Sequence, residues 1–479
     1  MSASNTTPPD DLSVAPTLKP GLPREQAKIV SATVIGTAVE WYDFFVYALA
    51  AGMVFSKIFF EPAGPGMATV LAFLTVGISF LFRPLGAFLA GHFGDKLGRR
   101  AVLVTTMVLM GVATTLVGVL PTYAQAGIIA PILLILVRIT QGLAAGGQWG
   151  GAVLMAVEHA PHKQRGLFGA GPQIGVPLGL VMASATLGVM NVIAPGDAFF
   201  AWGWRVPFLL SIVLVIVAHL VRHGVSESPV FLEISERAEQ TKAPAMRLIR
   251  NHWQIVLVGA LVFAGNGAVG YMVTGGFIQN YASDPAGPIA LDRGVVLLSV
   301  SIAGLWWVVT TVLAGWASDK IGRIRTYVIG WVLQGAAIVV LFPLVNTGNV
   351  VLMTLALCFL TTGTGFTYGP QPALYAEIFP AAIRFSGVSI TYALGSILGG
   401  AFAPTIAQAL IQATGTTTSI AIYLGGATLV GFIATILIRD RSWMPLGIDH
   451  EELQEQSPFR FSKEPERRPA PESTATPVV

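Results

Sequence analysis

Twelve long apolar runs divide this chain, and they restrict what it can fold into more than any other feature. A helix needs about 20 apolar residues to cross the roughly 30 Å hydrocarbon core of a bilayer. Only 11% of the residues are charged, against about a quarter in soluble proteins. The sequence therefore predicts an all-α integral membrane protein with twelve transmembrane helices, approximately at residues 29–56, 67–91, 101–120, 127–157, 166–192, 203–221, 253–281, 294–317, 326–344, 349–376, 385–412 and 418–438.

A charged turn follows the second run and returns in the second half of the chain. Residues 91–100 read GHFGDKLGRR, and residues 315–323 read GWASDKIGR, which repeats the Gly, Asp, Lys, Gly and Arg 224 residues later. A glutamate and an arginine seven residues apart also recur, 219 residues later, as Glu158 with Arg165 and Glu377 with Arg384. Self-similarity at so long a period is typical of transporters built from internal repeats. We expect two pseudo-symmetric halves of six helices each.

The longest polar interruption separates these halves and sets the expected domain boundaries. If both termini are cytoplasmic, 23 of the 28 lysines and arginines lie in cytoplasmic segments, which is the bias that orients membrane proteins. Both tails are rich in Pro and charge, a composition typical of disorder. The predicted parts are a cytoplasmic tail at 1–27, an N-terminal half at 28–222, a cytoplasmic linker at 223–252, a C-terminal half at 253–440 and a second tail at 441–479.

The charged turn resembles the signature loop of the major facilitator superfamily, and its second copy resembles the weaker loop between helices eight and nine of that fold. Six further segments resemble the metabolite:proton symporters within it, which carry shikimate, 2-oxoglutarate, citrate, aromatic acids, or proline with betaine. They are residues 40–44 (EWYDF), 82–86 (FRPLG), 138–142 (RITQG), 149–152 (WGGA), 204–208 (WRVPF) and 377–380 (EIFP).

The resemblance covers about residues 28–440. It implies a fold and a location, and the chain departs from the family at one position. It implies the major facilitator fold, a monomer, and a multi-pass protein of a bacterial-type inner cell membrane. The departure is Gln148, which stands where that family is expected to carry a glutamate. The role of that acidic group is therefore open in this chain.

Ionisable residues inside the runs are candidates for proton coupling. A charge near the bilayer centre costs about 2.5–3.5 kcal/mol on insertion scales, so it needs a partner, a water-filled cavity or a task. Glu40 and Asp43 lie three residues apart and hence on one helix face, and Arg138 lies at the depth of Asp43 on an antiparallel helix. We expect Asp43 to accept the proton with Arg138 as its switchable partner, and Glu40 to share this role. A permanent structural ion pair is the alternative reading.

Polar groups in and between the runs supply the other candidates. The expected substrate contacts are Arg83, Arg138, Gln148, Asn266, Tyr271, Tyr368, Gln371 and Tyr392. The neutral ones are equally typical of hydrogen bonds between helices. Charged residues at the helix ends and in the two turns suggest a cytoplasmic gate formed by Asp95, Arg99, Arg100, Glu158, Arg165, Asp319, Arg323, Glu377 and Arg384.

Several functional classes find no support in the sequence. It has no P-loop and no metal-ligand spacing, so we expect no enzyme, no cofactor, no bound metal and no nucleic-acid partner. The favoured function is a proton-coupled symporter that imports a small organic acid by alternating access, with lipid, protons and the solute as partners. The alternatives are an osmolyte symporter, an antiport exporter, suggested by a partial glycine-proline motif at residues 171–175, and a non-transporting membrane sensor.

Overall fold

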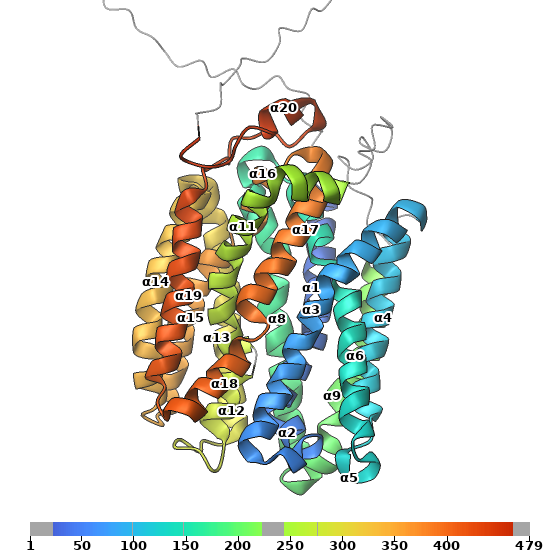
Figure 1. Ribbon diagram of the computed structural model, residues 1–479, viewed down its shortest axis with the longest axis vertical. Helices are drawn as coiled ribbons and strands as arrows, with labels where there is room; N and C mark the ends of the chain where they lie inside the picture. Colours follow the sequence, from blue (N-terminus) through green and yellow to red (C-terminus); the bar gives the residue numbers. More distant parts are fainter. Residues whose placement is uncertain (1–22, 98, 147, 223–243, 275, 463–479) are drawn as a thin grey trace, which may run out of the picture.

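The computed structural model describes residues 23–462 apart from residues 98, 147, 223–243 and 275. Within this part eleven helices are long and apolar enough to cross a membrane, and a shorter apolar helix, Thr105–Val119, supplies a twelfth. The helices stand side by side in one bundle (Figure 1). The predicted all-α membrane fold with twelve helices is confirmed.

The twelve spans follow the predicted runs closely, and several are interrupted helices. In the N-terminal half they are α1 (Pro23–Ala50) with η1 (Ala51–Phe55) and α2 (Ser56–Ile58), α3 (Pro65–Leu97), α4 (Arg99–Val119), α6 (Ile129–Ala145) with α7 (Gln148–Glu158), α8 (Arg165–Ile193), and η4 (Phe199–Gly203) with α9 (Arg205–Arg222). In the C-terminal half they are α11 (Pro244–Thr274) with α12 (Phe277–Ser283), α13 (Arg293–Ile321), α14 (Arg323–Val345), α15 (Val350–Tyr368) with α16 (Gln371–Ile378), α17 (Arg384–Gly395) with η6 (Ser396–Gly400) and α18 (Ala403–Thr414), and α19 (Thr418–Leu437).

Two predicted boundaries differ from the structure. The predicted tail at 1–27 and linker at 223–252 lie mostly outside the described residues, but α1 already begins at Pro23 and α11 at Pro244. Both helices therefore extend several residues beyond the apolar runs. A helix can continue past the hydrocarbon because its backbone hydrogen bonds are internal and its polar side chains then reach water or headgroups.

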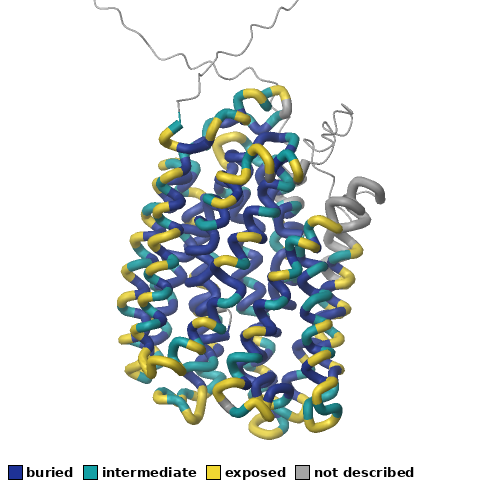
Figure 2. The backbone as a smooth tube through the Cα atoms, in the orientation of Figure 1, coloured by how far each residue is buried: buried dark blue, intermediate teal, exposed yellow. Residues whose placement is uncertain are grey.

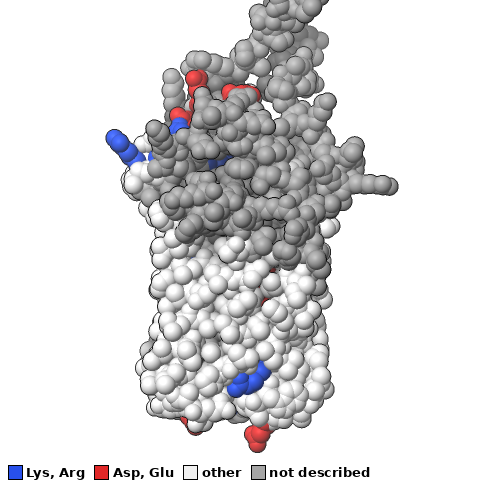
Figure 3. Space-filling view, turned by 90° about the vertical axis from the view of Figure 1, so that its right-hand side faces the viewer, with Lys and Arg blue, Asp and Glu red and all other residues white. Residues whose placement is uncertain are grey.

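The outer surface of the bundle is apolar, as a lipid-facing surface must be. Large hydrophobic side chains are exposed all round it; Val339 is 72% and Ile422 71% exposed. Buried residues line the helix faces that point inward (Figure 2), and the side shown in Figure 3 has a broad belt without charge. An apolar patch of this extent is a liability in water and the expected state in a bilayer.

Glycines allow the closest helix contacts in the N-terminal half. A Cβ added to Gly142 on α6 would collide with the backbone oxygen of Ser79 on α3, and one added to Gly146 would collide with that of Arg83. Small residues at this spacing let backbones approach within a membrane. These two glycines thus allow the close crossing of α3 and α6.

The two halves touch at both ends of the bundle. At one end, which we call the charged end, α8 meets α13, and a Cβ on Gly315 would lie 2.7 Å from the backbone oxygen of Gly166. At the opposite end, a Cβ on Gly276, which has φ +85°, would lie 2.5 Å from the oxygen of Ala48. There Gln412 also donates to the oxygen of Gly66 at 3.0 Å. The space between the halves is therefore flanked by contacts on either side.

Residues 439–462 form a folded segment over the charged end, which we call the strap. It contains the short helices η7 (Ile448–His450) and α20 (Glu451–Gln454), seen at the upper end in Figure 1. Arg441 and Met444 are fully buried. The prediction of disorder from residue 441 is wrong for 441–462, because average composition misses a few well-placed buried groups. Residues 463–479 lie outside the described part.

Candidate functional site

An arginine without an ionic partner lies between the halves. Arg83, on α3, is 6% exposed, and its guanidinium carbon lies 4.1 Å from the ring centre of Phe80, 5.6 Å from that of Trp41 and 5.7 Å from that of Phe44. Its Nε has no hydrogen-bond partner within the described residues, and none of their carboxylates forms an ion pair with it. Aromatic faces attract a cation, but they leave its hydrogen-bonding capacity free.

The C-terminal half closes this site with tyrosines. The ring of Tyr271 lies 5.5 Å from that of Phe80, and Tyr392 stacks on Trp149 at 3.7 Å. The hydroxyl of Tyr271 is buried and has no hydrogen-bond partner within the described part, and the buried hydroxyl of Tyr392 faces that of Tyr368. We call this the central aromatic site and define it by Trp41, Phe44, Phe80, Arg83, Trp149, Tyr271, Tyr368 and Tyr392.

The structure thus brings four predicted substrate contacts together and adds aromatic ones that sequence reasoning missed. Arg83, Tyr271, Tyr368 and Tyr392 lie in the central aromatic site, whereas Trp41, Phe44, Phe80 and Trp149 were not predicted. A usable signal was present, because Phe80 precedes Arg83 by three residues and so shares its helix face. A cation without an ion-pair partner among the described residues, tyrosine hydroxyls and several ring faces suit an anion that carries a ring or hydroxyl groups.

Three other predicted substrate contacts have partners or positions elsewhere. Arg138 is fully buried and donates to the oxygens of Thr75 and Val76, both at 3.2 Å, and to Ser79 Oγ at 2.8 Å. It therefore fastens α6 to α3. Asn266 donates to the Thr364 oxygen at 3.2 Å, which is a contact between α11 and α15. The amide of Gln371 is buried without a hydrogen-bond partner among the described residues, at the start of α16.

The carboxylates of α1 face a cavity inside the N-terminal half. Its walls are Gly36, Val39, Glu40, Asp43, Met107, Met110, Gln148 and Val215, from α1, α4, α7 and α9. With the Gln148 amide oriented to suit its neighbours, its nitrogen donates to Glu40 Oε2 at 3.2 Å and its oxygen accepts from the Met107 nitrogen at 3.1 Å. Gln148 therefore belongs with the carboxylates and not with the central aromatic site, contrary to our expectation.

Asp43 and Arg138 are connected through two side chains and not by a direct ion pair. Arg138 Nη1 donates to Gln141 Oε1 at 2.7 Å, and Gln141 Nε2 donates to Thr114 Oγ1 at 2.8 Å. Asp43 faces the hydroxyls of Thr114 and Ser211, and its buried Oδ1 has no hydrogen-bond partner within the described residues. The expected direct ion pair between Asp43 and Arg138 is therefore not present. The Arg138 guanidinium instead donates to backbone and amide oxygens. We call this connection the Gln141–Thr114 link.

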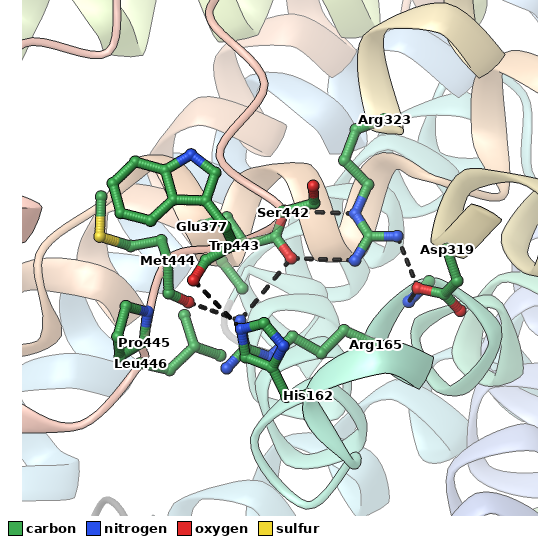
Figure 4. A network of polar contacts seen from close by, with 12 residues as sticks. His162, Arg165, Asp319, Arg323, Glu377, Ser442, Trp443, Met444, Pro445 and Leu446 are labelled. Carbon is green, nitrogen blue, oxygen red and sulfur yellow. Dashed lines mark hydrogen bonds and ion pairs between the residues drawn. The ribbon is translucent and has the colours of Figure 1, made fainter. Parts of the chain in front are cut away.

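The predicted gate residues meet at the charged end (Figure 4). Arg323 Nη2 donates to Glu377 Oε1 at 3.0 Å, and Arg165 lies 3.9 Å from the same oxygen. Asp319 accepts from Arg323 at 2.6 Å and from the backbone nitrogens of residues 166 and 167 at 2.8 and 2.9 Å. These contacts join α8 of one half to α13 and α16 of the other.

A second ion pair crosses between the halves at the same end. Arg384 Nη1 lies 3.5 Å from Glu158 Oε1. Six of the nine predicted gate residues therefore form contacts at the charged end. The side chains of Asp95, Arg99 and Arg100 lie outside the part of the chain whose side chains the structure describes.

Two helical halves with a polar site between them, and with contacts at both ends, define a secondary transporter. Residues 33–404 match the family model of the Major Facilitator Superfamily. The chain belongs to that family, and it is a multi-pass membrane transporter and not an enzyme.

Similar proteins come from several bacteria. The inner membrane metabolite transport protein YhjE of Escherichia coli is 38% identical over 87% of this chain and 95% of its own length. The shikimate transporter of E. coli is 34% identical, over 85% and 92%. The glycine betaine/proline/ectoine/pipecolic acid transporter OusA of Dickeya dadantii is 30% identical, over 88% and 84%.

A solved structure with the same fold is the proton:xylose symporter XylE bound to 6-bromo-6-deoxy-D-glucose. Its TM-score is 0.69 at 18% identity, and the match covers 86% of this chain and 95% of XylE. At this identity the likeness shows the shared fold.

Proposed function

We propose that the protein is a proton-coupled symporter that imports a small organic acid by alternating access. The observation that carries the proposal is Arg83, which has no ion-pair partner among the described residues and lies in an aromatic site between the halves. A buried charge without a partner is unfavourable, and a substrate carboxylate would supply that partner. We further propose that it acts as a monomer in a bacterial inner membrane with both termini cytoplasmic.

The aromatic site favours an organic acid over an osmolyte such as betaine. Quaternary ammonium ligands are recognised by cages of aromatic faces. Here the guanidinium of Arg83 already lies over Phe80 and within 5.7 Å of the rings of Trp41 and Phe44. A second cation at these faces would be repelled, whereas a carboxylate would be attracted.

Charge balance explains why an anion would travel with a proton. Moving an uncompensated charge through the membrane-spanning region is costly. Substrate on Arg83 adds one negative charge, and a proton on Asp43 removes one, so the loaded carrier has the same net charge as the empty one. Anion binding and proton binding then promote each other.

The ring of Phe44 offers a short route between the two charge centres. The guanidinium carbon of Arg83 lies 5.7 Å from the centre of this ring, and that of Arg138 lies 5.6 Å from it. Arg138 in turn reaches Asp43 through the Gln141–Thr114 link. A shift of Phe44 on substrate binding would therefore disturb the surroundings of the proton site, which is on the same helix.

Uptake into proteoliposomes tests the proposal. The solutes are shikimate, 2-oxoglutarate, aromatic acids and betaine, under an imposed pH gradient or an imposed potential. We expect a monocarboxylate to accumulate when the outside is acidic. A monoanion with one proton is electroneutral, so a potential of 100 mV, worth about 2.3 kcal/mol per charge, should drive no uptake. Uptake of betaine alone would show that the solute is an osmolyte and not an organic acid. Outward movement of the solute would show that the protein is an exporter and not an importing symporter.

A further inference from the structure

The strap contacts the N-terminal half through its main-chain carbonyls. The oxygen of Met444 accepts from Arg165 Nη1 at 2.6 Å, and the oxygen of Trp443 lies 3.1 Å from His162 Nε2. Arg165 lies farther from Glu377, at 3.9 Å. The carbonyl of the strap is thus the nearer partner of this gate arginine, as Figure 4 shows.

The same strap contacts the C-terminal half. The oxygen of Leu446 accepts from Arg384 Nη1 at 2.9 Å. Gln454 Oε1 accepts from the backbone nitrogen of Ala381 at 2.7 Å and from Arg384 Nη2 at 3.2 Å. Glu451 lies 3.2 Å from Arg247 at the start of α11. The strap therefore bridges the halves at the end where the gate network lies.

The strap is held in shape by two buried polar side chains. Arg441 donates to the oxygens of Gln454, at 3.0 Å, and Gln456. Gln454 Nε2 donates to the oxygens of Pro445 and Gly447, both at 2.8 Å. Because Gln454 also contacts Ala381 and Arg384, this one side chain connects the internal structure of the strap to its docking on the bundle.

We infer that the strap is a working part of the gate, which stabilises the state closed at the charged end. Opening at that end separates Arg165 and His162 from Arg384 and Ala381. Because the strap continues directly from α19 of the C-terminal half, it must first release Arg165 and His162 of the N-terminal half. A change that weakens the strap destabilises the state closed at the charged end more than the state open there. It therefore shifts the carrier toward the open state. The inference rests on alternating access as proposed above, but not on the substrate or the coupling ion.

An accessibility measurement tests this without any substrate. Ser389, on α17, is 5% exposed, and its Oγ occupies the place where a Cβ on Gly150 of α7 would lie. It is therefore buried between the halves. A Ser389→Cys protein, with the single native cysteine Cys358 replaced by serine, would be placed in nanodiscs, and the rate of alkylation by a soluble maleimide would be measured.

The variant pair is Gln454→Ala and Gln456→Ala. Gln454 makes the four contacts described above, whereas the buried Gln456 Oε1 has no hydrogen-bond partner within the described residues. We expect Gln454→Ala to raise the alkylation rate about fivefold or more, which corresponds to a loss of about one or two kcal/mol in the free energy that favours the closed state over the open state. We expect Gln456→Ala to leave the rate unchanged. Equal rates in a folded Gln454→Ala protein would overturn the inference. Failure of the transport assays would not affect this readout.

A tether supplies a second test that does not depend on weakening the fold. Cysteines at His162 and Trp443, in the same Cys358→Ser background, would be joined by a reducible bis-methanethiosulfonate reagent. We expect loss of solute exchange on joining, recovery with dithiothreitol, and no loss in either single-cysteine protein. Full exchange by the joined protein would show that the strap need not release His162 before that end opens, and the inference would fall.

Discussion

Two arginines lie within the membrane-spanning part of the N-terminal half, and their surroundings differ. Arg138 donates to two backbone oxygens and to the side chains of Ser79 and Gln141. Arg83 lies against the aromatic faces of Trp41, Phe44 and Phe80 and has no ion-pair partner among the residues that the structure describes. Arginine thus braces two helices in one place and, in the other, is the group that we propose binds the anion. The difference lies in the acceptors within reach.

Substitution of each arginine should separate these roles. Removing one partner of a buried charge pair costs about 2–5 kcal/mol, so we expect Arg83→Gln to raise KM for the anion at least about 30-fold with little change in thermal stability. Arg138→Gln should instead lower the melting temperature, because several buried hydrogen bonds at about 1 kcal/mol each are lost. Uptake kinetics and thermal melting in detergent check both. An unchanged KM in Arg83→Gln would remove Arg83 from the substrate site.

Asp43→Asn tests the proton site. An amide has nearly the shape of a carboxylic acid but cannot exchange a proton in this way, so we expect uphill uptake driven by a pH gradient to disappear while exchange of labelled for unlabelled substrate continues. Asp292→Asn is a suitable control, since Asp292 only caps α13 by accepting from the Val295 nitrogen at 3.1 Å. Full accumulation by the Asp43→Asn protein would contradict the assignment.

At the scale of elements, the close crossing of α3 and α6 fixes how Arg83 and Arg138 lie relative to each other. Gly142 and Gly146 bring the backbone of α6 against that of α3, and Arg138 then reaches the carbonyls of α3. Helix geometry and residue size therefore position a charged group that the bilayer would otherwise exclude.

A matched pair of glycine substitutions tests this crossing. Forcing an extra methyl group into a packed contact costs about 1–3 kcal/mol, so Gly142→Ala should lower the melting temperature and reduce uptake. Gly335 on α14 has nothing within 4 Å of an added Cβ, so Gly335→Ala should be neutral or slightly stabilising. If both variants melt alike, the contact between α3 and α6 is looser than described.

The helices were predictable from the sequence because the bilayer demands long apolar runs, whereas their interruptions were not. The break between α11 and α12, and the π-helical turns η1 and η6, lie inside the predicted runs 253–281, 29–56 and 385–412. The site was half predictable for a similar reason. Buried ionisable residues stand out in such segments, but the acceptors of Arg138, the Gln141–Thr114 link and the rings around Arg83 come from packing between helices that are distant in sequence.

At the scale of the whole molecule, the two halves share a fold but differ in charge. The repeated turn contributes Asp319 and Arg323 to the charged end in the C-terminal half. The candidate charged residues Asp43, Arg83 and Arg138 all come from the N-terminal half. The C-terminal half contributes tyrosines to the central aromatic site. Duplication accounts for the fold, and the later divergence of the halves accounts for the chemistry.

The orientation of the whole chain is open to a direct test. With 23 of 28 lysines and arginines on the side of the termini, the positive-inside rule places both termini in the cytoplasm. A green fluorescent protein fused after Val479 should fluoresce in cells, and alkaline phosphatase at the same place should be inactive. A fluorescent fusion after Val119, at the end of α4, should be dark. The opposite pattern would show that both termini lie outside the cytoplasm. The gate at the charged end would then not be a cytoplasmic gate.

Contacts at both ends of the bundle have a consequence for the energy balance of a cell. Asp43 is 1% exposed, and the halves meet through Gly315 and Gly166 on one side of it and through Gly276 and Ala48 on the other. We expect these contacts to hinder the passage of protons through a carrier that rests in this form. A cell could therefore hold many copies of the protein without dissipating its proton-motive force when no substrate is present.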